Sequence, residues 1–575
     1  MFFSLLETLN RTEKIKFFSI TILIIISMAF ELVGITSIFP FVKVLVSEKE
    51  ESLNTFKIVL NYFQFSSKEE LVLFFSAITF IIFFLKSTYF YLLSRIQFSF
   101  AMNFQNRIAN GVFRYYLNLK YKDFIKIKTS KIIQNITIES YNFIHGFFLC
   151  SLTIISEIII SCGILIFLLI LNFKVFLLCL CFSLITFFIY LNATKKKLKY
   201  FGELRNNLEN KRIKTVQNTF LMFKELIIYD KKNFFKDRFS SENKIFCDAS
   251  KQILILEFLP RHFIDLFFIS IVVCSIAGII LFDGSFNTVD LSILSIFFLG
   301  GSRIVISLAR LLNTMQRIKF YNPSVKSITS ILNENINDDV NRPSNKNYYP
   351  PKFDSLEFIN FNFKYDDKYI FRNANLKIYK NETIAITGGN GSGKSTLVDL
   401  LIGIQKIDGG QIKLNNTKIK NKEEFELTQY CGLLPQNITI FDDSIASNIS
   451  INNNNKEQDK KIVDQFKIKN LTKFIKEISN EKSYNLGEQG NKLSGGQRQR
   501  ISIARLLYHD PQILIFDEPT SAIDTIGTEE FKKLIKLLQL KKTIIIITHD
   551  KSLLKLCNKI LYLSNEKIEL EDGSA

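Results

Sequence analysis

Long apolar stretches in the first 320 or so residues limit what this chain can fold into more than any other feature. A helix needs about 20 mostly apolar residues to cross the hydrocarbon core of a bilayer. Six segments meet that requirement, and they lie at residues 17–46, 71–96, 144–171, 173–194, 263–282 and 291–312. The sequence therefore predicts a membrane domain of six helices.

The charges of the connecting loops predict how these helices are oriented. Residues 98–143 contain seven Lys or Arg and two acidic residues, and residues 195–251 contain fifteen and seven. Loops with such an excess of positive charge stay on the cytoplasmic side of a membrane. In contrast, residues 48–70 have five Glu and three Lys, and residues 283–290 have no cation. We therefore expect both chain termini to lie in the cytoplasm.

The two basic loops are too long to be simple turns. We expect helices that extend beyond the bilayer and bend near residues 117–131 and 219–232. These loops also explain much of the formal net charge of +19, so no nucleic acid partner is expected. The eight cysteines include no C-x-x-C pair, which gives no sign of a metal site or a disulfide framework. Because Met1 to Lys16 lacks a cleavable signal pattern, the first apolar stretch should remain as an anchor.

The pattern of the chain changes after the sixth apolar segment. Residues 1–325 are predicted to be the membrane domain, and residues 326–353 a linker. The stretch from Asn333 to Pro351 is rich in Asn, Asp and Pro and has no periodic apolar pattern. Residues 354–575 alternate in the manner of a soluble α/β domain. Two structural halves of different kinds are therefore expected.

The soluble half contains a phosphate-binding pattern at residues 381–400, where an apolar strand, a glycine-rich turn and a helix follow one another. The turn reads Gly388-x4-Gly393-Lys394-Ser395, and its glycines let backbone N–H groups and a helix N-terminus face phosphates. Lys394 would neutralise the charge of the β- and γ-phosphates, and Ser395 would hold Mg²⁺. This pattern predicts a nucleoside triphosphate site.

Three further apolar strands end in polar side chains that suit hydrolysis. Asp517 and Glu518 end ILIFDEP, where Asp517 would bind Mg²⁺ through water and Glu518 would polarise the attacking water. His549 ends TIIIITHD, a strand expected beside the previous one and within reach of the γ-phosphate. Gln436 ends the strand in LLPQN and could join Mg²⁺ to the water. Each residue type is more often structural when it occurs alone, so the assignments depend on the whole set.

The stretch LSGGQRQR, which begins at Leu493, completes this set, and residues 354–575 together resemble the nucleotide-binding domain of an ABC transporter. The membrane half resembles the six-helix exporter type. The resemblance implies ATP and Mg²⁺ as cofactors. It also implies that the signature closes over a nucleotide held by Lys394 of another subunit, so that two identical copies work as a homodimer.

The resemblance assigns a role to each matching residue. Its catalytic residues are Glu518, His549 and Gln436, and its Mg²⁺ ligands are Ser395, Gln436 and Asp517. Tyr365 would stack on adenine. The full ATP-binding set is Tyr365, Gly388, Gly389, Asn390, Gly391, Ser392, Gly393, Lys394, Ser395, Thr396, Ser494, Gly495, Gly496, Gln497 and Asp524.

The chain departs from the exporter pattern at two positions. Pro519 stands where exporters usually have Ala, and Asp550 follows the histidine where Arg is usual; both residues resemble those of importer ATPases. The fused membrane half and the segment GEQG at 487–490, which resembles the exporter segment that contacts the membrane domain, favour export. The fold class implied is a membrane all-α six-helix domain followed by an α/β P-loop ATPase domain, as in a type IV-like ABC exporter.

Cations within the apolar segments offer a clue to the substrate. Lys86 lies in the second segment, Arg261 at the approach to the fifth, and Arg303 and Arg310 seven residues apart in the sixth. A cation at the centre of a membrane helix costs about 2.5–3.5 kcal/mol on insertion scales, so it usually faces a cavity or a partner. These four residues are therefore candidates for a basic cavity wall that binds an anionic lipid pyrophosphate. The alternative is that Arg310, Arg261 and Arg317, which lies seven residues after Arg310, reach the cytoplasmic interface or pair with an acidic residue, Glu31 or Glu157.

A short amphipathic helix is predicted at residues 52–64, with an ordinary packed loop helix as the alternative. Together with the cations, it resembles the bacterial flippases that turn over polyprenyl-pyrophosphate-linked oligosaccharides for protein N-glycosylation. We therefore expect a homodimeric, ATP-driven flippase in a bacterial inner membrane, with the ATPase domain in the cytoplasm, that contacts membrane lipids and moves an amphipathic anionic lipid-linked substrate. The alternatives are export of a lipid A-like glycolipid or of a peptide, including a bacteriocin. An ATP-gated channel or regulator is a further alternative, which intact Glu518 and His549 disfavour.

Overall fold

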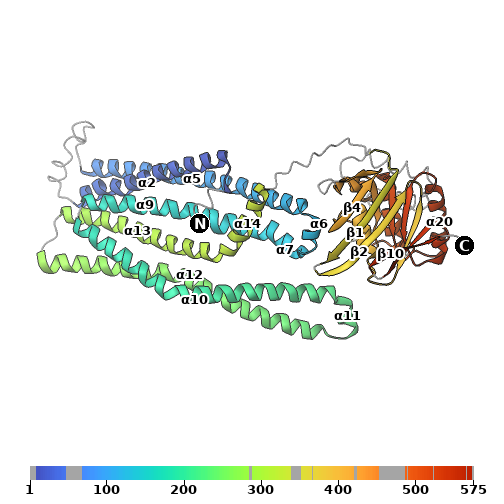
Figure 1. Cartoon of the computed structure of the whole chain (residues 1–575). Coiled ribbons are helices and arrows are strands. Elements are labelled where there is room, and N and C mark those ends of the chain that lie inside the picture. The colour runs from blue at the N-terminus through green and yellow to red at the C-terminus, as the bar shows by residue number, and fades with distance from the viewer. Residues whose placement is uncertain are drawn as a thin grey trace. The chain divides into compact units, whose positions relative to one another are not determined.

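The computed structural model describes residues 8–46, 68–171, 173–283, 288–337, 351–365, 367–419, 424–451, 486–487, 490–521, 523–564 and 566–572. The chain divides into two compact units (Figure 1). One contains Met1–Leu119 and Ile127–Val340, and the other contains Lys120–Lys126 and Asn341–Ala575.

The first unit is built from long helices. Their bounds are α2 (Arg11–Val46), α5 (Lys68–Asn118), α9 (Leu149–Leu171), α10 (Phe173–Leu221), α12 (Lys232–Asp283), α13 (Thr288–Phe320) and α14 (Asn322–Asn337). Among the described residues, three helical stretches are long and apolar enough to cross a membrane: Arg11–Leu45, Lys68–Asn118 and Thr129–Leu171. They cover the first three predicted spans, apart from Val46 at the end of the first. The other three predicted spans lie in α10, α12 and α13. Most side chains of the spans in α10 and α12, and those of residues 291–297 in α13, lie outside the described set.

Short elements interrupt the helices where the sequence predicts bends. Between α5 and α9 lie α6 (Tyr121–Phe124), α7 (Thr129–Gln134), the π-helix η1 (Asn135–Glu139), α8 (Ser140–Asn142) and the π-helix η2 (Phe143–Phe148). Between α10 and α12 lies α11 (Phe223–Ile228). Both predicted bends are therefore present. The predicted helix at 52–64 lies outside the described residues.

The predicted linker at 326–353 begins within a helix, because α14 continues to Asn337. Residues 338–350 lie outside the described set, and β1 (Ser355–Tyr365) begins shortly after the description resumes at residue 351. The exact boundary between the two domains stays a prediction.

Aromatic side chains fill the core between α2, α5, η2 and α9. Phe148 is fully buried, and its ring lies 5.0 Å from the ring of Phe104 and 5.4 Å from that of Phe100, both edge-on. Edge-on pairs gain energy beyond the area that they bury, because the positive ring edge faces a negative ring face. The many Phe residues of the apolar segments thus hold neighbouring helices together.

Outside this bundle, α10 packs along α12, which runs beside it (Figure 1). The guanidinium of Arg205 lies over the rings of Phe246 and Phe320, at 5.6 and 5.1 Å. Two turns further along α10, Arg212 lies 4.0 Å from the same Phe246 ring and 5.8 Å from that of Phe239. Arginines of α10 therefore make attractive contacts with aromatic rings of α12 and, through Phe320, of α13.

The second unit contains two sheets. The first is four-stranded and antiparallel, in the order β2-β1-β4-β5, with β1, β2 (Lys368–Tyr379), β4 (Gly409–Leu414) and β5 (Thr417–Lys418). The second is six-stranded, in the order β10-β9-β3-β8-β7-β6. Its strands are β3 (Thr383–Gly388), β6 (Cys431–Leu434), β7 (Ile513–Asp517), β8 (Thr543–Ile547), β9 (Lys559–Ser564) and β10 (Lys567–Asp572).

The central strands of the six-stranded sheet are parallel and buried. All five residues of β8 are buried, and β8 lies between β3 and β7, both of which run in its direction. Strands covered on both faces read as continuous apolar runs, as TIIII and ILIF do. Because parallel strands end at the same edge, the turns that follow β3, β7 and β8 lie near one another. An all-α membrane unit and an α/β P-loop unit confirm the expected fold class.

Candidate nucleotide site

The glycine-rich turn joins β3 to α15 (Lys394–Ile402). The Lys394 ammonium folds back over this turn and donates hydrogen bonds to the carbonyl oxygens of Gly388 and Gly389, at 2.7 and 3.0 Å. Gly393 has φ 98°, and a Cβ there would lie 2.6 Å from Cγ2 of Ile370. Backbone N–H groups in such a turn, with a helix N-terminus behind them, form a concave site for anions.

Glu518, the residue after β7, links the end of β7 to the end of β8 and to Gln436. Glu518 has φ 50°, a left-handed conformation that is unfavourable for a residue with a side chain, and its N–H donates to the carbonyl of Ile547 at the end of β8, at 3.0 Å. Its carboxylate accepts a hydrogen bond from Nε2 of Gln436 at 2.7 Å. The structure therefore brings together two of the predicted catalytic side chains, which are 82 residues apart in the sequence.

His549 and Asp550 lie just beyond β8, after Thr548. His549 is exposed, and β8 lies beside β7, as the sequence predicts. The carboxylate of Asp550 accepts a hydrogen bond from the N–H of Ser552 at 2.8 Å and caps α21 (Lys551–Leu554). A hydrogen bond with the Ser552 side chain and, to a smaller extent, the one with its N–H lower the pKa of Asp550. The unusual acid after the histidine thus has a structural use as a helix cap.

Two partly buried carboxyl groups near the phosphate-binding turn, those of Asp517 and Asp399, favour the binding of a cation. Burial raises the pKa of Asp517, and the nearby Glu518 carboxylate raises it further, whereas Lys394 lowers it. Burial, with a smaller effect from Asp517, raises the pKa of Asp399 in α15 to about 6. A divalent cation bound beside these groups would relieve their mutual repulsion.

The Mg²⁺ ligands predicted from the sequence fit this electrostatic setting. Ser395 is the second residue of α15 and is exposed, and Asp517 is half-buried at the end of β7. Within the described part of the chain, no three His, Cys, Asp or Glu side chains form a metal site by themselves. Mg²⁺ is usually held by one or two protein groups together with nucleotide phosphates and water.

Tyr365 is the last residue of β1 and lies near the P-loop helix. Its hydroxyl shares a hydrogen bond with the side chain of Thr396, and burial raises its pKa. The side chain remains 37% exposed, and its ring packs edge-on against Phe363 at 5.0 Å. Tyr365 thus places a partly exposed aromatic ring beside the helix that follows the phosphate-binding turn, and its role in adenine stacking stays a prediction.

The signature segment begins α19 (Gly495–Tyr508). Ser494 is its N-cap: its hydroxyl accepts the N–H of Gln497, and the Gln497 side chain accepts the N–H of Ser494 at 2.8 Å, which is a capping box. Asp524 likewise caps α20 (Thr525–Leu538), since it accepts the N–H of Gly527 at 2.9 Å. Of the predicted GEQG segment, Glu488 and Gln489 lie outside the described residues.

The structure also gives the surroundings of the predicted substrate cations. Lys86 and Arg303 both contact the buried carboxylate of Glu31, and Arg310 contacts that of Glu157. Pairing of Arg310 with an acidic residue, predicted above as an alternative, is therefore present, and Lys86 and Arg303 are paired as well. The side chain of Arg261, in α12, lies outside the described set.

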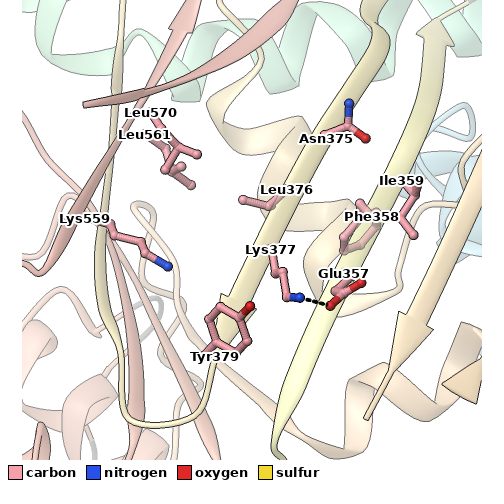
Figure 2. A pocket seen from close by; sticks show the side chains of 10 residues that line it. All are labelled: Glu357, Phe358, Ile359, Asn375, Leu376, Lys377, Tyr379, Lys559, Leu561 and Leu570. Atoms are coloured by element: carbon pink, nitrogen blue, oxygen red, sulfur yellow. Dashed lines mark ion pairs between the residues drawn. The ribbon is translucent and has the colours of Figure 1, made fainter. Parts of the chain in front are cut away.

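A separate cavity of ≈ 390 Å³ lies between the two sheets of the second unit (Figure 2). It is bordered by the ion pair of Lys377 and Glu357, by Tyr379 and by Lys559. Lys559 pairs with Ile384 at the beginning of β3, whereas the phosphate-binding turn follows the end of β3. The cavity therefore lies toward the beginning of β3, whereas the nucleotide site lies at its end.

Sequence reasoning missed Asp399. Asp399 lies four residues after Ser395, so both residues lie on the same face of the helix. This spacing could have indicated that Asp399 is close to the nucleotide site. The pattern could not show that the carboxyl group would be half-buried and close to Asp517, because that depends on how α15 packs against the sheet.

Comparisons with known proteins agree with this geometry. A family model described as "ABC transporter" matches residues 371–521. A putative export ATP-binding/permease protein of Rickettsia typhi is 37% identical over 228 residues, which is 39% of each chain. An ATP-dependent lipid A-core flippase of Pasteurella multocida is 34% identical over 221 residues, 38% of each chain. The match thus spans about two fifths of the length of these curated relatives.

A solved structure is similar over nearly the whole chain. It is described as a bacterial Atm1-family ABC exporter with ATP bound, and it has a TM-score of 0.76 and 18% sequence identity. The alignment covers 98% of this chain and 96% of that one. At this identity, the likeness establishes the fold of both units, including the helices whose side chains are not described.

Proposed function

We propose that this chain, an ABC transporter with its membrane helices and ATPase domain in one polypeptide, is an ATP-driven exporter that works as a homodimer in a bacterial inner membrane. The observation that carries the proposal is the set of polar side chains at the edge of the six-stranded sheet where β3, β7 and β8 end. There, Lys394 covers the phosphate-binding turn and Gln436 holds the Glu518 carboxylate. A domain with all of these groups is equipped for turnover and not only for nucleotide binding.

Hydrolysis follows from the positions of these groups. The turn and Lys394 would bind the phosphates, and Ser395 and Asp517 would hold Mg²⁺, which neutralises charge on the phosphate oxygens. Glu518 would orient and polarise the attacking water, with Gln436 fixing its carboxylate through the 2.7 Å hydrogen bond. His549, exposed at the end of β8, would stabilise the γ-phosphate as it leaves.

The homodimer is supported by how the signature is built. Two hydrogen bonds between Ser494 and Gln497 form a capping box that fixes the first turn of α19. The N-terminus of a helix attracts negative charge. In the proposed dimer this end faces the γ-phosphate bound by the partner subunit. The two sites are then shared, and each requires both chains.

For the substrate, we propose an amphipathic anionic glycolipid, with a polyprenyl-pyrophosphate-linked oligosaccharide as the first candidate. Support comes from Lys86, Arg303 and Arg310, three cations in the membrane unit. A lipid A-like glycolipid is the second candidate, because several relatives of the ATPase domain are named lipid A-core flippases.

The test is ATP-dependent lipid movement in vesicles that contain the purified protein. Polyprenyl-pyrophosphate oligosaccharide, lipid A and a neutral glycolipid are compared, with Glu518→Gln as the control for the motor. We expect one of the anionic lipids to be moved, little movement of the neutral one, and none with Glu518→Gln. Stimulation of ATP hydrolysis by peptides alone would contradict a lipid substrate, and ATP-independent movement would contradict export.

A further inference from the structure

A cluster of charged side chains joins four helices of the membrane unit. Glu31 of α2 accepts a hydrogen bond from Nε of Arg303 of α13 at 2.6 Å, and its other oxygen lies 3.0 Å from Nζ of Lys86 of α5. Lys86 also lies 5.1 Å from the ring centre of Phe83. One carboxylate thus binds two of the proposed substrate cations at once.

A second carboxylate completes the cluster. Glu157 of α9 lies 2.9 Å from NH1 of Arg310 and 3.5 Å from NH1 of Arg303, and it accepts a hydrogen bond from the hydroxyl of Ser307. The guanidinium of Arg303 is therefore shared between two carboxylates that come from different helices. We call Glu31, Lys86, Glu157, Arg303 and Arg310 the ion cluster.

The ion cluster is buried except at one end. The side chains of Glu31 and Glu157 are 6% and 4% exposed, whereas that of Arg310 is 58% exposed. Two acidic and three basic groups leave one positive charge in excess. Removing charges from water is costly, so all of these ions need partners in this position. All three cations therefore have carboxylate partners within the ion cluster. Because Arg310 is the most exposed of them, an arriving anion would contact it first.

We propose that Glu31 and Glu157 are internal competitors of the substrate, which they mimic by presenting two negative charges to Arg303. A headgroup that replaces both carboxylates must itself carry two negative charges a few ångströms apart, as a diphosphate does. It would pair first with exposed Arg310 and then with Arg303 and Lys86. This inference rests on the proposed export of an anionic amphiphile, and it assigns Glu31 and Glu157 as specificity-determining residues.

Displacement of the carboxylates also links binding to movement. Once the cations pair with a headgroup, Glu31 and Glu157 lose their partners while still buried, which is unfavourable unless α2 and α9 separate from α13 or admit water. The helices therefore favour a different arrangement with substrate bound, and the arrangement described here is the substrate-free one. A ligand shifts such an equilibrium only through its different affinity for the two states, and this exchange of partners supplies that difference.

The test compares Glu31→Gln and Glu157→Gln with Glu13→Gln. Glu13 forms a bidentate ion pair with Arg107, with both hydrogen bonds at 2.8 Å. This pair also joins α2 to α5 but lies outside the ion cluster. ATP hydrolysis is measured in vesicles with rising amounts of a diphosphate lipid, a monophosphate lipid or a neutral lipid of equal chain length. Inorganic diphosphate is added separately to distinguish a free anion from a lipid headgroup.

We expect Glu31→Gln and Glu157→Gln each to lower the half-saturating concentration of the diphosphate lipid about tenfold, a common size for coupled sites. Glu13→Gln should leave that concentration unchanged, and the monophosphate lipid should stimulate less than the diphosphate lipid. Glu13→Gln should lower thermal stability only. If Glu31→Gln and Glu157→Gln behave in the same way, with no fall in the half-saturating concentration of the diphosphate lipid, the inference is overturned.

Two further measurements keep the outcomes separate. Ser307→Ala retains every charge but removes the hydrogen bond to Glu157 and a longer one, of 3.4 Å, from Arg303. It should therefore fold and shift the half-saturating concentration in the same direction by a smaller factor. If Lys86→Ala and Arg303→Ala bind nucleotide but respond to the diphosphate lipid like the unmodified protein, the proposed substrate site itself fails. A loss of response in these variants, together with no effect of Glu31→Gln, would overturn only the role of the acids.

Discussion

At the scale of single residues, the nucleotide site depends on conformations and charges that the surrounding fold imposes. Gly393 needs a positive φ and has no room for a Cβ beside Ile370, whereas nothing lies within 4 Å of a Cβ at Gly389. Glu518 keeps its left-handed backbone because its N–H and side chain are both tied to neighbouring elements. Such strain persists only where the rest of the structure compensates for it.

The two loop glycines give a matched pair of variants. We expect Gly393→Ala to destabilise the nucleotide-free protein by about 1–3 kcal/mol, from left-handed strain and contact with Ile370. Gly389→Ala should change stability by less than about 0.5 kcal/mol. Thermal unfolding in detergent, followed without nucleotide, measures both. Equal losses in the two variants would show that backbone geometry is not what selects Gly393.

Asp399 should make stability depend on pH. Its pKa of about 6 in the folded protein lies above the usual value of about 3.9, so folding favours the neutral acid. The stabilisation is complete below about pH 4 and is lost as the pH rises through 6. Asp399→Asn should therefore raise the free energy of unfolding at pH 7.5 by about 1–2 kcal/mol and have little effect near pH 4.

These measurements need nucleotide-free, Mg²⁺-free protein, because bound cations would stabilise the carboxylate. Exposed Asp354, whose side chain is 71% accessible, supplies the control variant Asp354→Asn, which should shift stability by less than about 0.5 kcal/mol at each pH. A gain from Asp399→Asn that is the same at pH 4 and pH 7.5 would contradict the titration of this group.

At the scale of elements, close packing around η2 sets how α13 continues into α14. A Cβ at Gly146 of η2 would overlap the ring of Tyr321, which lies between those two helices. π-Helical turns widen a helix locally and are often found at functional sites. The tight contact therefore fixes the point where the last membrane helix turns toward the linker.

Gly146→Ala tests this contact. Overpacking should lower stability by about 1–3 kcal/mol, and Gly146→Ala combined with Tyr321→Ala should lose less than the sum of the two single changes. Gly111→Ala in α5 is the control, since its Cβ would make an ordinary contact of 3.8 Å with Leu332. It should be neutral or stabilise by up to about 1 kcal/mol, because Ala favours helix over Gly. Additive losses would place the strain elsewhere.

At the scale of the whole molecule, the proposed homodimer makes a prediction about mixed subunits. Lys394→Ala removes the phosphate-binding lysine, and Gly495→Asp places a carboxylate at the N-terminus of α19, where it would repel the γ-phosphate. If the sites are shared, a mixed dimer has one site with both changes and one intact site. Purified mixed dimers should then hydrolyse ATP at about half the normal rate, because two-fold symmetry makes the sites equivalent.

Each variant paired with itself should be nearly inactive, since every site then lacks one component. Differently tagged subunits allow the mixed dimers to be purified and their ATP hydrolysis to be compared with both parents. Mixed dimers as inactive as the parents would show that each chain needs its own signature and lysine together, which contradicts sharing.

Much of the fold and the nucleotide site could be predicted from the sequence because they rest on local patterns. Continuous apolar runs fix membrane helices and buried parallel strands by length and hydropathy, and the P-loop motif fixes the turn by its glycines. Placement of β8 beside β7 followed from the same patterns, and it is confirmed. The bends after α5 and α10 were also predictable, since the charged loops were too long for turns.

Only the tertiary structure decided which charged groups meet, because pairs distant in the sequence leave no local pattern. Gln436 reaches Glu518 across 82 residues, and Arg303 reaches Glu31 across 272. The sequence by itself determined that costly cations lie within the membrane segments and named Glu31 and Glu157 as one set of partners. The packing of α2, α5, α9 and α13 decided that two carboxylates share one guanidinium, since only adjacent helices can bring buried ions within hydrogen-bonding distance.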